Sequence, residues 1–316
     1  MSRDELASLV AQWITEHDPR HRFSAFDGNA LGKLERGVVK RPREDVRMAL
    51  CELLNATETE LGFSPDEEDE RVSAAASGRL HTDARALAAI ADALAHLRQL
   101  EDFTSAATVL PNVLTQRATV RELARNAKGN VRKTAIGLLS ELEQYLGWLS
   151  IPMGRWNASL AHLDRASVLA VEADDAFRLS TALSFSAYRH LRRADLSSAE
   201  ALNAAAARDE RVHLGLRTYV TFQRAEVLAR AGSKNEALKT LNKAENMVGR
   251  LANDDEPLPP SGYWYVPSFF RGQRAFVLRA LGDAKEARRV AQEALDAMPP
   301  GWKTSEWAVR RRKLAS

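Results

Sequence analysis

LRALGDAKEARRVAQEALDAMP, residues 278–299, is the stretch that decides how this chain folds. An apolar segment precedes Gly282, a longer helix-forming segment follows it, and Pro299 ends the stretch. Glycine adopts the left-handed backbone of a tight turn without steric cost. Ala287 and Ala294 are small, so a helix that carries them can approach its neighbours closely. The stretch therefore predicts a helix, a tight turn and a second helix.

Three further segments align with this stretch when all are placed on their turn residues, which are Gly154, Ala194, Gly232 and Gly282. Five positions later each segment has a small residue: Ser159, Ala199, Ala237 and Ala287. Nine positions after the turn the residues are Leu163, Asn203, Leu241 and Ala291. Twelve positions after it, each segment has an alanine: Ala166, Ala206, Ala244 and Ala294. A single hairpin cannot bury its apolar face alone, so we expect the repeats to stack into an array.

The pattern resembles the tetratricopeptide repeat, most clearly in residues 278–299 and in LARAGSKNEALKTLNKAENM, residues 228–247. This resemblance implies an α-solenoid of helical hairpins that serves binding rather than catalysis. The turn residues are farther apart than the roughly 34 positions of that family, so we expect extended helices or loops and an irregular superhelix. Two helices at 83–99 and 105–126 are expected to form a preceding hairpin, with Pro111 starting or kinking the second.

The composition favours helices and excludes several classes of protein. Alanine and leucine are abundant and strand-like alternation is not evident, so the predicted fold class is all-α. The formal net charge of +3 is too small to indicate nucleic-acid binding by itself. A single cysteine, Cys51, leaves no internal disulfide and fits a reducing cytoplasm. No window resembles a membrane span, and Arg3, Asp4 and Glu5 stand where a signal peptide needs an apolar core. We therefore expect a cytoplasmic protein without membrane contact.

The sequence divides into three parts. Residues 64–82 contain a proline, an acidic run and a Ser/Ala/Gly stretch without amphipathic period, which predicts a linker between a domain at 1–63 and a repeat domain at 83–316. Helices are predicted in the first domain at about 2–16, 27–36 and 43–54. Ser2 and Glu5 have the spacing of a capping box at the start of the first helix. The apolar face of that helix is predicted to consist of Leu6, Leu9, Val10, Trp13 and Ile14.

DGNALGKLERGVVKRP, residues 27–42, and its continuation at 43–63 resemble the recognition helix and following part of bacterial Xre-type helix-turn-helix regulators. The shared features are the Leu-Glu-Arg-Gly core at 34–37 and the basic turn with its proline at 40–42. One large group of these regulators has a tetratricopeptide-like C-terminal region with a VLPxV segment, which recurs here at 109–113. The resemblance implies a transcriptional regulator whose repeats sense an effector or form a homo-oligomer. Such domains place a helix ahead of the pair, so the domain is expected either to begin upstream or to be degenerate.

Six residues are predicted to contact DNA. Asn29 and Lys33 are four positions apart on one face of the helix at 27–36, where they are placed to hydrogen-bond base edges. The flanking cations, placed to hold phosphates, are Arg36, Lys40, Arg41 and Arg43. The alternative interpretation is a solvated basic turn, because residues 1–63 contain nine Lys and Arg against eleven Asp and Glu.

A second candidate site lies in the repeats. Tyr263, Trp264 and Tyr265 stand on a predicted loop that could close over a groove on the concave face. Cations expected to meet an acidic ligand there are Arg189, Arg193 and Arg224. The predicted occupant is a peptide, a protein or a small-molecule effector. The alternative is that the aromatic residues are inter-helix core and that the arginines are solvated surface.

No motif for catalysis is present: the sequence has no phosphate loop, dinucleotide glycine pattern, nucleophile elbow or zinc-protease signature. We therefore predict no catalytic residue and no cofactor. His17 and His21 have metal-ligand spacing, but Pro19 breaks the helix between them, so no metal site is predicted. The basic run at 310–313 is interpreted either as the exposed end of a final helix or as a contact to DNA phosphates or an acidic partner. The alternative function is a non-catalytic protein- or peptide-binding scaffold with a degenerate helix-turn-helix that no longer binds DNA.

Overall fold

The structure is a computed structural model that describes residues 2–17, 26–39, 41–58, 60–63, 72, 76 and 82–316. Among these residues the regular secondary structure is helical and no strand occurs, which confirms the all-α prediction. Lys40, His21 and most of the predicted linker lie outside the described residues. The chain forms two compact units, Met1–Ser73 and Ala74–Ser316, and each is described by itself.

Helices of the N-terminal unit surround a small apolar core. They are α1 (Arg3–His17), α2 (Gly28–Glu35) and α3 (Glu44–Leu54). Fully buried core residues come from each of them: Val10, Ile14, Leu31, Val46, Ala49 and Leu50. Cys51 is half-buried on α3. Asn55 ends α3 in the left-handed conformation, a position that asparagine tolerates better than most residues.

The first turn of α1 contains the predicted capping box. The Ser2 hydroxyl accepts a hydrogen bond from the Glu5 backbone N–H at 3.2 Å, and the Glu5 carboxylate accepts one from the Ser2 backbone N–H at 2.6 Å. The predicted apolar face is wrong at one position: Leu9 is 41% exposed, whereas Ala7 is buried. Because the buried face of α1 is centred on Val10 and Ile14, the turn geometry places Ala7 on this face and Leu9 beside it.

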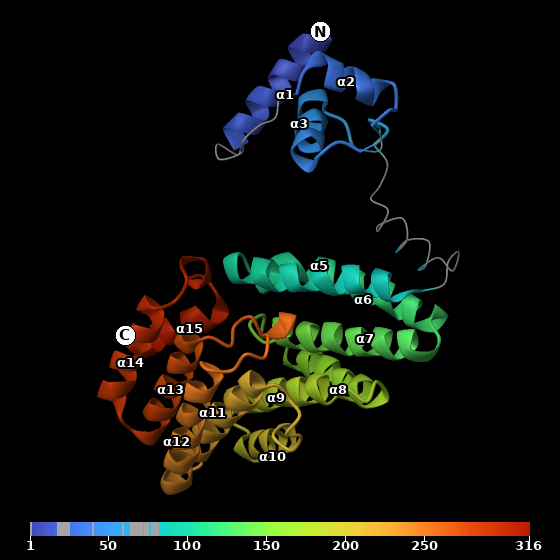
Figure 1. The fold of residues 1–316 in the computed structure, drawn as a ribbon. Helices are drawn as coiled ribbons and strands as arrows, with labels where there is room; N and C mark the ends of the chain where they lie inside the picture. Colours follow the sequence, from blue (N-terminus) through green and yellow to red (C-terminus); the bar gives the residue numbers. More distant parts are fainter. Residues whose placement is uncertain are drawn as a thin grey trace. The chain divides into compact units, whose positions relative to one another are not determined.

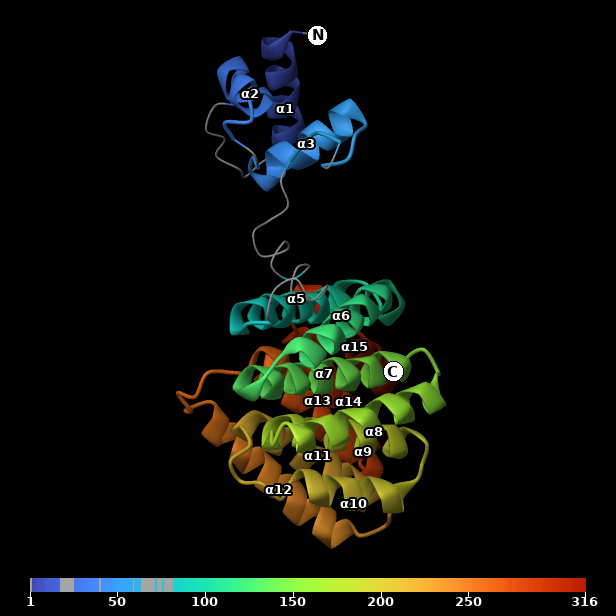
Figure 2. The ribbon, with the colours of Figure 1, turned by 90° about the vertical axis from the view of Figure 1, so that its right-hand side faces the viewer.

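The repeat unit is a succession of helical pairs followed by a final helix (Figures 1 and 2). The helices are α5 (Ala84–Phe103), α6 (Ala106–Asn126), α7 (Gly129–Ser150), α8 (Trp156–Glu172), α9 (Ala176–Arg192), α10 (Leu196–Ala206), α11 (Leu214–Arg230), α12 (Lys234–Leu251), α13 (Pro267–Leu281), α14 (Ala284–Asp296) and α15 (Glu306–Ala315). Two short 3₁₀ segments, η1 (Pro260–Gly262) and η2 (Pro300–Trp302), interrupt the connections. Each helix packs against its partner in the pair, and α7, α9, α11 and α13 also pack in sequence against one another.

The four aligned turn residues all adopt the left-handed conformation. Their φ angles are 71° at Gly154, 61° at Ala194, 84° at Gly232 and 98° at Gly282. Each turn joins the two helices of one pair, so the sequence alignment identified the same structural position in every repeat. Ala194 is the only non-glycine among the four, and it carries the steric cost that a Cβ imposes there.

The small residues after each turn lie at the helix interfaces. The four residues at the fifth position and the four alanines at the twelfth position are all exposed by 2% or less. In the first two repeats a serine of the first helix forms a hydrogen bond with the alanine at the twelfth position. The Ser140 hydroxyl donates to the Ala166 carbonyl and the Ser180 hydroxyl to the Ala206 carbonyl, each at 2.7 Å. The predicted close approach of helices in the repeats is therefore confirmed.

One boundary of the first hairpin differs from the sequence prediction, and one of the two alternatives for Pro111 is excluded. α5 continues to Phe103, beyond the predicted end at Gln99, because only Thr104 and Ser105 leave the helical conformation. α6 begins at Ala106, where the Ser105 hydroxyl accepts the Thr108 backbone N–H at 3.2 Å. Pro111 therefore lies inside α6 rather than starting it. The serine cap sets the start because it satisfies a free N–H of the first turn.

Two segments from the C-terminal part of the array pack against its first helix, α5. The connection from α12 to α13, which includes η1, reaches back to α5, and η2 also packs against α5 (Figure 1). This long connection explains why the third and fourth turn residues are farthest apart in the sequence. Within the described part of the chain, no helix is both long and apolar enough to cross a bilayer.

Substitution of two glycines tests whether glycine stabilises the repeats by permitting the left-handed turn. A Cβ at Gly282 would have open space but a φ of 98°, whereas a Cβ at Gly249 in α12 would have open space and no such strain. We expect Gly282→Ala to lower the free energy of unfolding by about 1–2 kcal/mol. Gly249→Ala should raise it by about 0.5 kcal/mol because alanine favours helix.

Chemical denaturation of both variants beside the parent chain measures the two changes. If both alanine variants shift stability in the same direction, the left-handed turn is not what the glycine supplies.

Candidate functional site

A cavity of the repeat unit is lined by α5, α7, α9, α11, the connection between α12 and α13, α13 and α15. The volume of the cavity, counted over the positions that the centre of a water molecule can occupy, is about 90 Å³. A single buried water needs only about 10–15 Å³ on this measure, so the cavity has room for a small molecule. Aromatic rings form much of its wall, among them Tyr145, Trp148, Phe185, Tyr188, Tyr219 and Trp264.

Edge-to-face contacts hold these rings in place. Trp148 meets Phe185 at a centroid distance of 5.7 Å and an interplanar angle of 76°. Tyr219 meets Trp264 at 5.2 Å and 87°. Such arrangements match the positive edge of one ring to the negative face of another. These contacts restrict the rotation of the rings that line the cavity.

The aromatic triplet predicted on the loop, Tyr263, Trp264 and Tyr265, lines the cavity. Tyr265 is 4% exposed and fits against two glycines. A Cβ at Gly215 would lie 2.3 Å from the Tyr265 ring, and a Cβ at Gly262 would lie 2.4 Å from it. Only glycine therefore permits this ring position, which anchors the loop to α11.

Two adjacent carboxylates on α5 reach the cavity. Glu101 and Asp102 are 8% and 3% exposed. The Asp102 carboxylate accepts hydrogen bonds from the Tyr263 hydroxyl at 2.6 Å and from the Trp307 indole N–H at 3.3 Å. The Glu101 carboxylate accepts one from the Trp148 indole N–H at 3.2 Å. Asp102 thus fastens both the aromatic loop and α15 to α5.

Neither carboxylate has a cation within salt-bridge distance among the described residues. Arg98, on the same helix, pairs instead with Glu141 at 2.7 Å, and Glu141 also pairs with Arg178 at 2.8 Å. Burial therefore raises the pKa of Glu101 to about 7, with nearby Asp102 contributing in the same direction. Burial likewise raises the pKa of Asp102, against the hydrogen bonds from Tyr263 and Trp307 that lower it.

The three arginines predicted to line the groove do not line this cavity. The Arg189 guanidinium donates to the Trp156 carbonyl at 3.0 Å, and the Arg193 guanidinium lies 5.7 Å from the Trp156 ring centre. Arg224 donates to the Glu200 carboxylate at 2.9 Å. These side chains extend from α9 and α11 toward the second helices of the pairs, whereas the cavity lies on the other side.

The basic C-terminal run also differs from its predicted exposure. Arg311 is fully buried, and its guanidinium donates to the backbone carbonyls of Trp307 and Phe269. Arg310 lines the cavity and donates to the Tyr188 hydroxyl at 2.8 Å. The remaining cations of the run, at 312 and 313, are exposed. The stretch reads as a uniformly charged surface because the sequence does not show that α15 packs into the array.

Sequence reasoning therefore identified the aromatic loop but missed the charged wall formed by Arg98, Glu101, Asp102 and Arg310. Two acidic residues followed by a phenylalanine near a helix end have no recognisable motif. The available signal was weak: Glu101 and Asp102 stand among apolar residues at the place where α5 ends.

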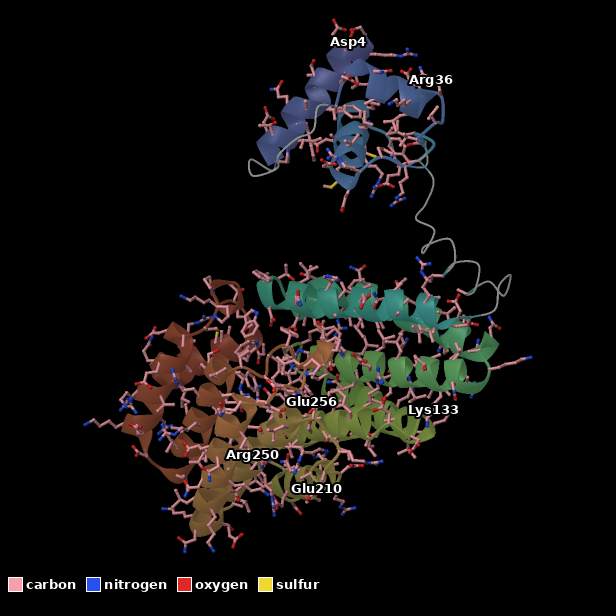
Figure 3. All side chains as sticks on the ribbon, in the orientation of Figure 1. Asp4, Arg36, Lys133, Glu210, Arg250 and Glu256 are labelled. Atoms are coloured by element: carbon pink, nitrogen blue, oxygen red, sulfur yellow. The ribbon has the colours of Figure 1, made fainter. Side chains whose placement is uncertain are left out.

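In the N-terminal unit, three of the predicted DNA-contacting residues share one exposed face. Asn29, Lys33 and Arg36 lie at successive turns of α2 and its C-cap, and all three are exposed (Figure 3 labels Arg36). Leu31 on the opposite face is buried, and Gly32 is buried beneath the Arg36 side chain, whose Nη1 would lie 3.1 Å from a Cβ at that position. The helix therefore presents an amide and two cations on a single polar surface.

Contacts with α1 fix the orientation of α2. A Cβ at Gly28 would lie 2.0 Å from the Asp4 carboxylate, so the two helices approach closely there. Arg3 pairs with Glu35 at 2.5 Å. Asp27 caps α2 by accepting the Ala30 backbone N–H at 2.8 Å. Contacts with α1 and the Asp27 cap therefore fix the direction in which the exposed face of α2 points.

The other described residues predicted to contact DNA, Arg41 and Arg43, come just before α3. Arg41 lies 3.6 Å from the Glu58 carboxylate, and Arg43 pairs with Asp45 at 3.1 Å. His17, the described member of the histidine pair, stacks on Trp13. No group of metal-ligating side chains with three or more members occurs in the described part of the chain.

Searches of family models and of curated proteins find no match for this chain.

The raised pKa of Glu101 predicts a pH-dependent stability. Between the ordinary value of 4.5 and about 7, the folded chain keeps a proton on Glu101 that the unfolded chain has lost. Stability from this group is therefore present at low pH and is lost as the pH rises toward 7, by up to about 3 kcal/mol. Glu101→Gln keeps an acceptor for Trp148 and carries no charge, so its stability should exceed that of the parent at about pH 8 and match it near pH 4.

Thermal or urea unfolding of the two proteins across this range measures the difference. A constant difference at all pH values would show that Glu101 is not the titrating group.

Proposed function

We propose that this chain is a DNA-binding transcriptional regulator of the Xre type. The N-terminal unit would contact DNA, and the tetratricopeptide-like repeats would sense a small-molecule effector or form a homo-oligomer. The observation that carries the proposal is the exposed face of α2, on which Asn29, Lys33 and Arg36 stand together. A helix that presents an amide and cations on one face suits the major groove.

Each side chain has a distinct role in this proposal. Asn29 would bond a base edge, because an amide can both donate to and accept from adenine. Lys33 would reach a base or a phosphate, and Arg36 at the end of α2 would hold a phosphate. Arg41 and Arg43 would add to the positive electrostatic potential that attracts DNA phosphates, although each lies near a carboxylate of its own unit.

The repeat unit supports the sensing half of the proposal. Its interior holds a cavity of about 90 Å³ with polar groups among aromatic walls, which is the usual composition of a small-molecule site. Effector binding there would have to favour one state of the regulator over another to change DNA affinity.

One observation favours the alternative, a protein- or peptide-binding scaffold without DNA affinity. Residues 1–63 carry more acidic than basic side chains, and Glu35 adds a negative charge to α2 itself. Phosphates repel such a surface unless the cations dominate locally.

Binding to the DNA upstream of its own gene tests the proposal, measured by fluorescence anisotropy at two salt concentrations. Lys33→Ala and Arg36→Ala should each weaken binding by about tenfold and lower the salt dependence by roughly one ion, because each removes an exposed phosphate or base contact. Asn29→Ala should relax the sequence preference more than it lowers affinity for unrelated DNA.

Lys133→Ala is the matched control, since Lys133 is an exposed lysine of the repeat unit whose partner is Asp174 at 3.1 Å. It should bind as the parent does. Salt-independent binding, or equal losses in all variants, would contradict the proposed DNA surface. Full-length protein with no DNA affinity at low salt would favour the scaffold.

A further inference from the structure

Two acidic side chains in the wall of the repeat-unit cavity lack a cationic partner in the part of the chain that the structure describes. Glu101 and Asp102 are buried, and among the described residues only neutral groups donate to their carboxylates: Trp148, Tyr263 and Trp307. A buried carboxylate is costly unless a positive charge or a proton accompanies it. The wall at α5 is therefore suited to a cation.

The nearest arginine of α5 does not supply this charge. Arg98 forms its ion pair with Glu141 at 2.7 Å, so that carboxylate balances its charge. Arg310, at the α15 wall, donates to the Tyr188 hydroxyl and lies 4.3 Å from the Phe276 ring centre. The carboxylates that act on the Arg310 charge are those of Glu226 and Glu306. Neither arginine therefore neutralises Glu101 or Asp102.

The aromatic wall favours the same kind of ligand. Ring faces attract positive groups, and indole attracts them most strongly. Trp148 lines the cavity and also donates its indole N–H to Glu101, so a ring and a carboxylate stand side by side. In the described part of the chain, no arginine or lysine lies over the Trp148, Tyr219 or Trp264 rings.

A hydrogen-bond donor completes the set. Arg98 is 5% exposed and lines the cavity, yet its Nη2 has no hydrogen-bond partner. A buried guanidinium N–H calls for an acceptor. An oxygen close to the positive group of a ligand would supply it. An anionic ligand is disfavoured because Glu101 and Asp102 would repel it, and a purely apolar ligand would satisfy none of these groups.

We propose that this cavity binds a small organic cation, a protonated amine or a quaternary ammonium compound that also carries an oxygen. Its positive group lies beside the carboxylates of Glu101 and Asp102 and against the Trp148 ring, and its oxygen faces Arg98. The proposal rests on the proposed function only in treating this ligand as the effector of the regulator, since binding itself is measured without DNA.

Calorimetric titration of the full chain with choline and with dimethylbutanol tests the proposal. Dimethylbutanol replaces the ammonium nitrogen of choline with carbon, so the two have nearly the same shape and differ in charge. Tyramine and 4-propylphenol form a second pair, in which carbon again replaces the ammonium nitrogen and both members keep a phenol oxygen. Each cation should bind at least about tenfold more tightly than its uncharged partner, because the ring faces and carboxylates act only on the charge.

Variants of the two acids separate charge from shape. Glu101→Gln keeps an acceptor for Trp148. Asp102→Asn keeps an acceptor for Trp307, and its amide can donate to the Tyr263 hydroxyl oxygen. Each variant should weaken cation binding at least about tenfold. Both replacements remove a buried charge, so the chain should still fold, which circular dichroism verifies. Glu210→Gln is the matched control at an exposed position of the repeat unit (Figure 3) and should bind choline as the parent does.

Equal affinity for the charged and uncharged partners would overturn the proposal, and so would cation binding that Glu101→Gln and Asp102→Asn leave unchanged. Failure of every probe to bind would overturn it as well. These outcomes are distinct from failure of the proposed function, because loss of DNA binding leaves the titration with choline unaffected.

Discussion

The structure of the repeat unit depends on the close approach of helices at small residues that follow a left-handed turn. Ser159, Ala199, Ala237 and Ala287 are fully buried, and each stands five positions after a residue with positive φ. A larger side chain at these positions would force the paired helices apart, because protein interiors are packed without spare volume. The turn sets the angle between the two helices, and the small residue sets their distance.

Stacking of these pairs creates an interior surface, and hydrogen bonds to α5 close it. Asp102 joins the aromatic loop through Tyr263 and the last helix through Trp307, so segments far apart in the sequence meet at one carboxylate. Thr304 adds a hydrogen bond to the Asp102 backbone carbonyl at 2.9 Å. The closure that turns an open array into a cavity thus depends on buried acidic residues, which explains why a binding surface and an electrostatic imbalance occur together.

The two proposals assign different chemistry to the two units. The α2 surface offers an amide and cations in an exposed setting, which suits a large, charged and hydrated partner. The repeat cavity offers carboxylates and rings in a buried setting, where a single charge has a much larger effect. A regulator needs both kinds of site, one to hold DNA and one to respond to a small molecule.

The sequence by itself determined the helical fold and the repeat, because turn residues and small interface residues recur at fixed spacing and act locally. It also identified the helix boundaries in the N-terminal unit and the loop with Tyr263, Trp264 and Tyr265. Leu9 was misassigned since a few degrees of helix rotation decide which edge of a face is covered. Only the tertiary structure decided the polar wall of the cavity. Glu101 and Asp102 come from one end of the array and Arg310 from the other. The burial of the two acids without a cationic partner among the described residues arises from packing that no local pattern encodes.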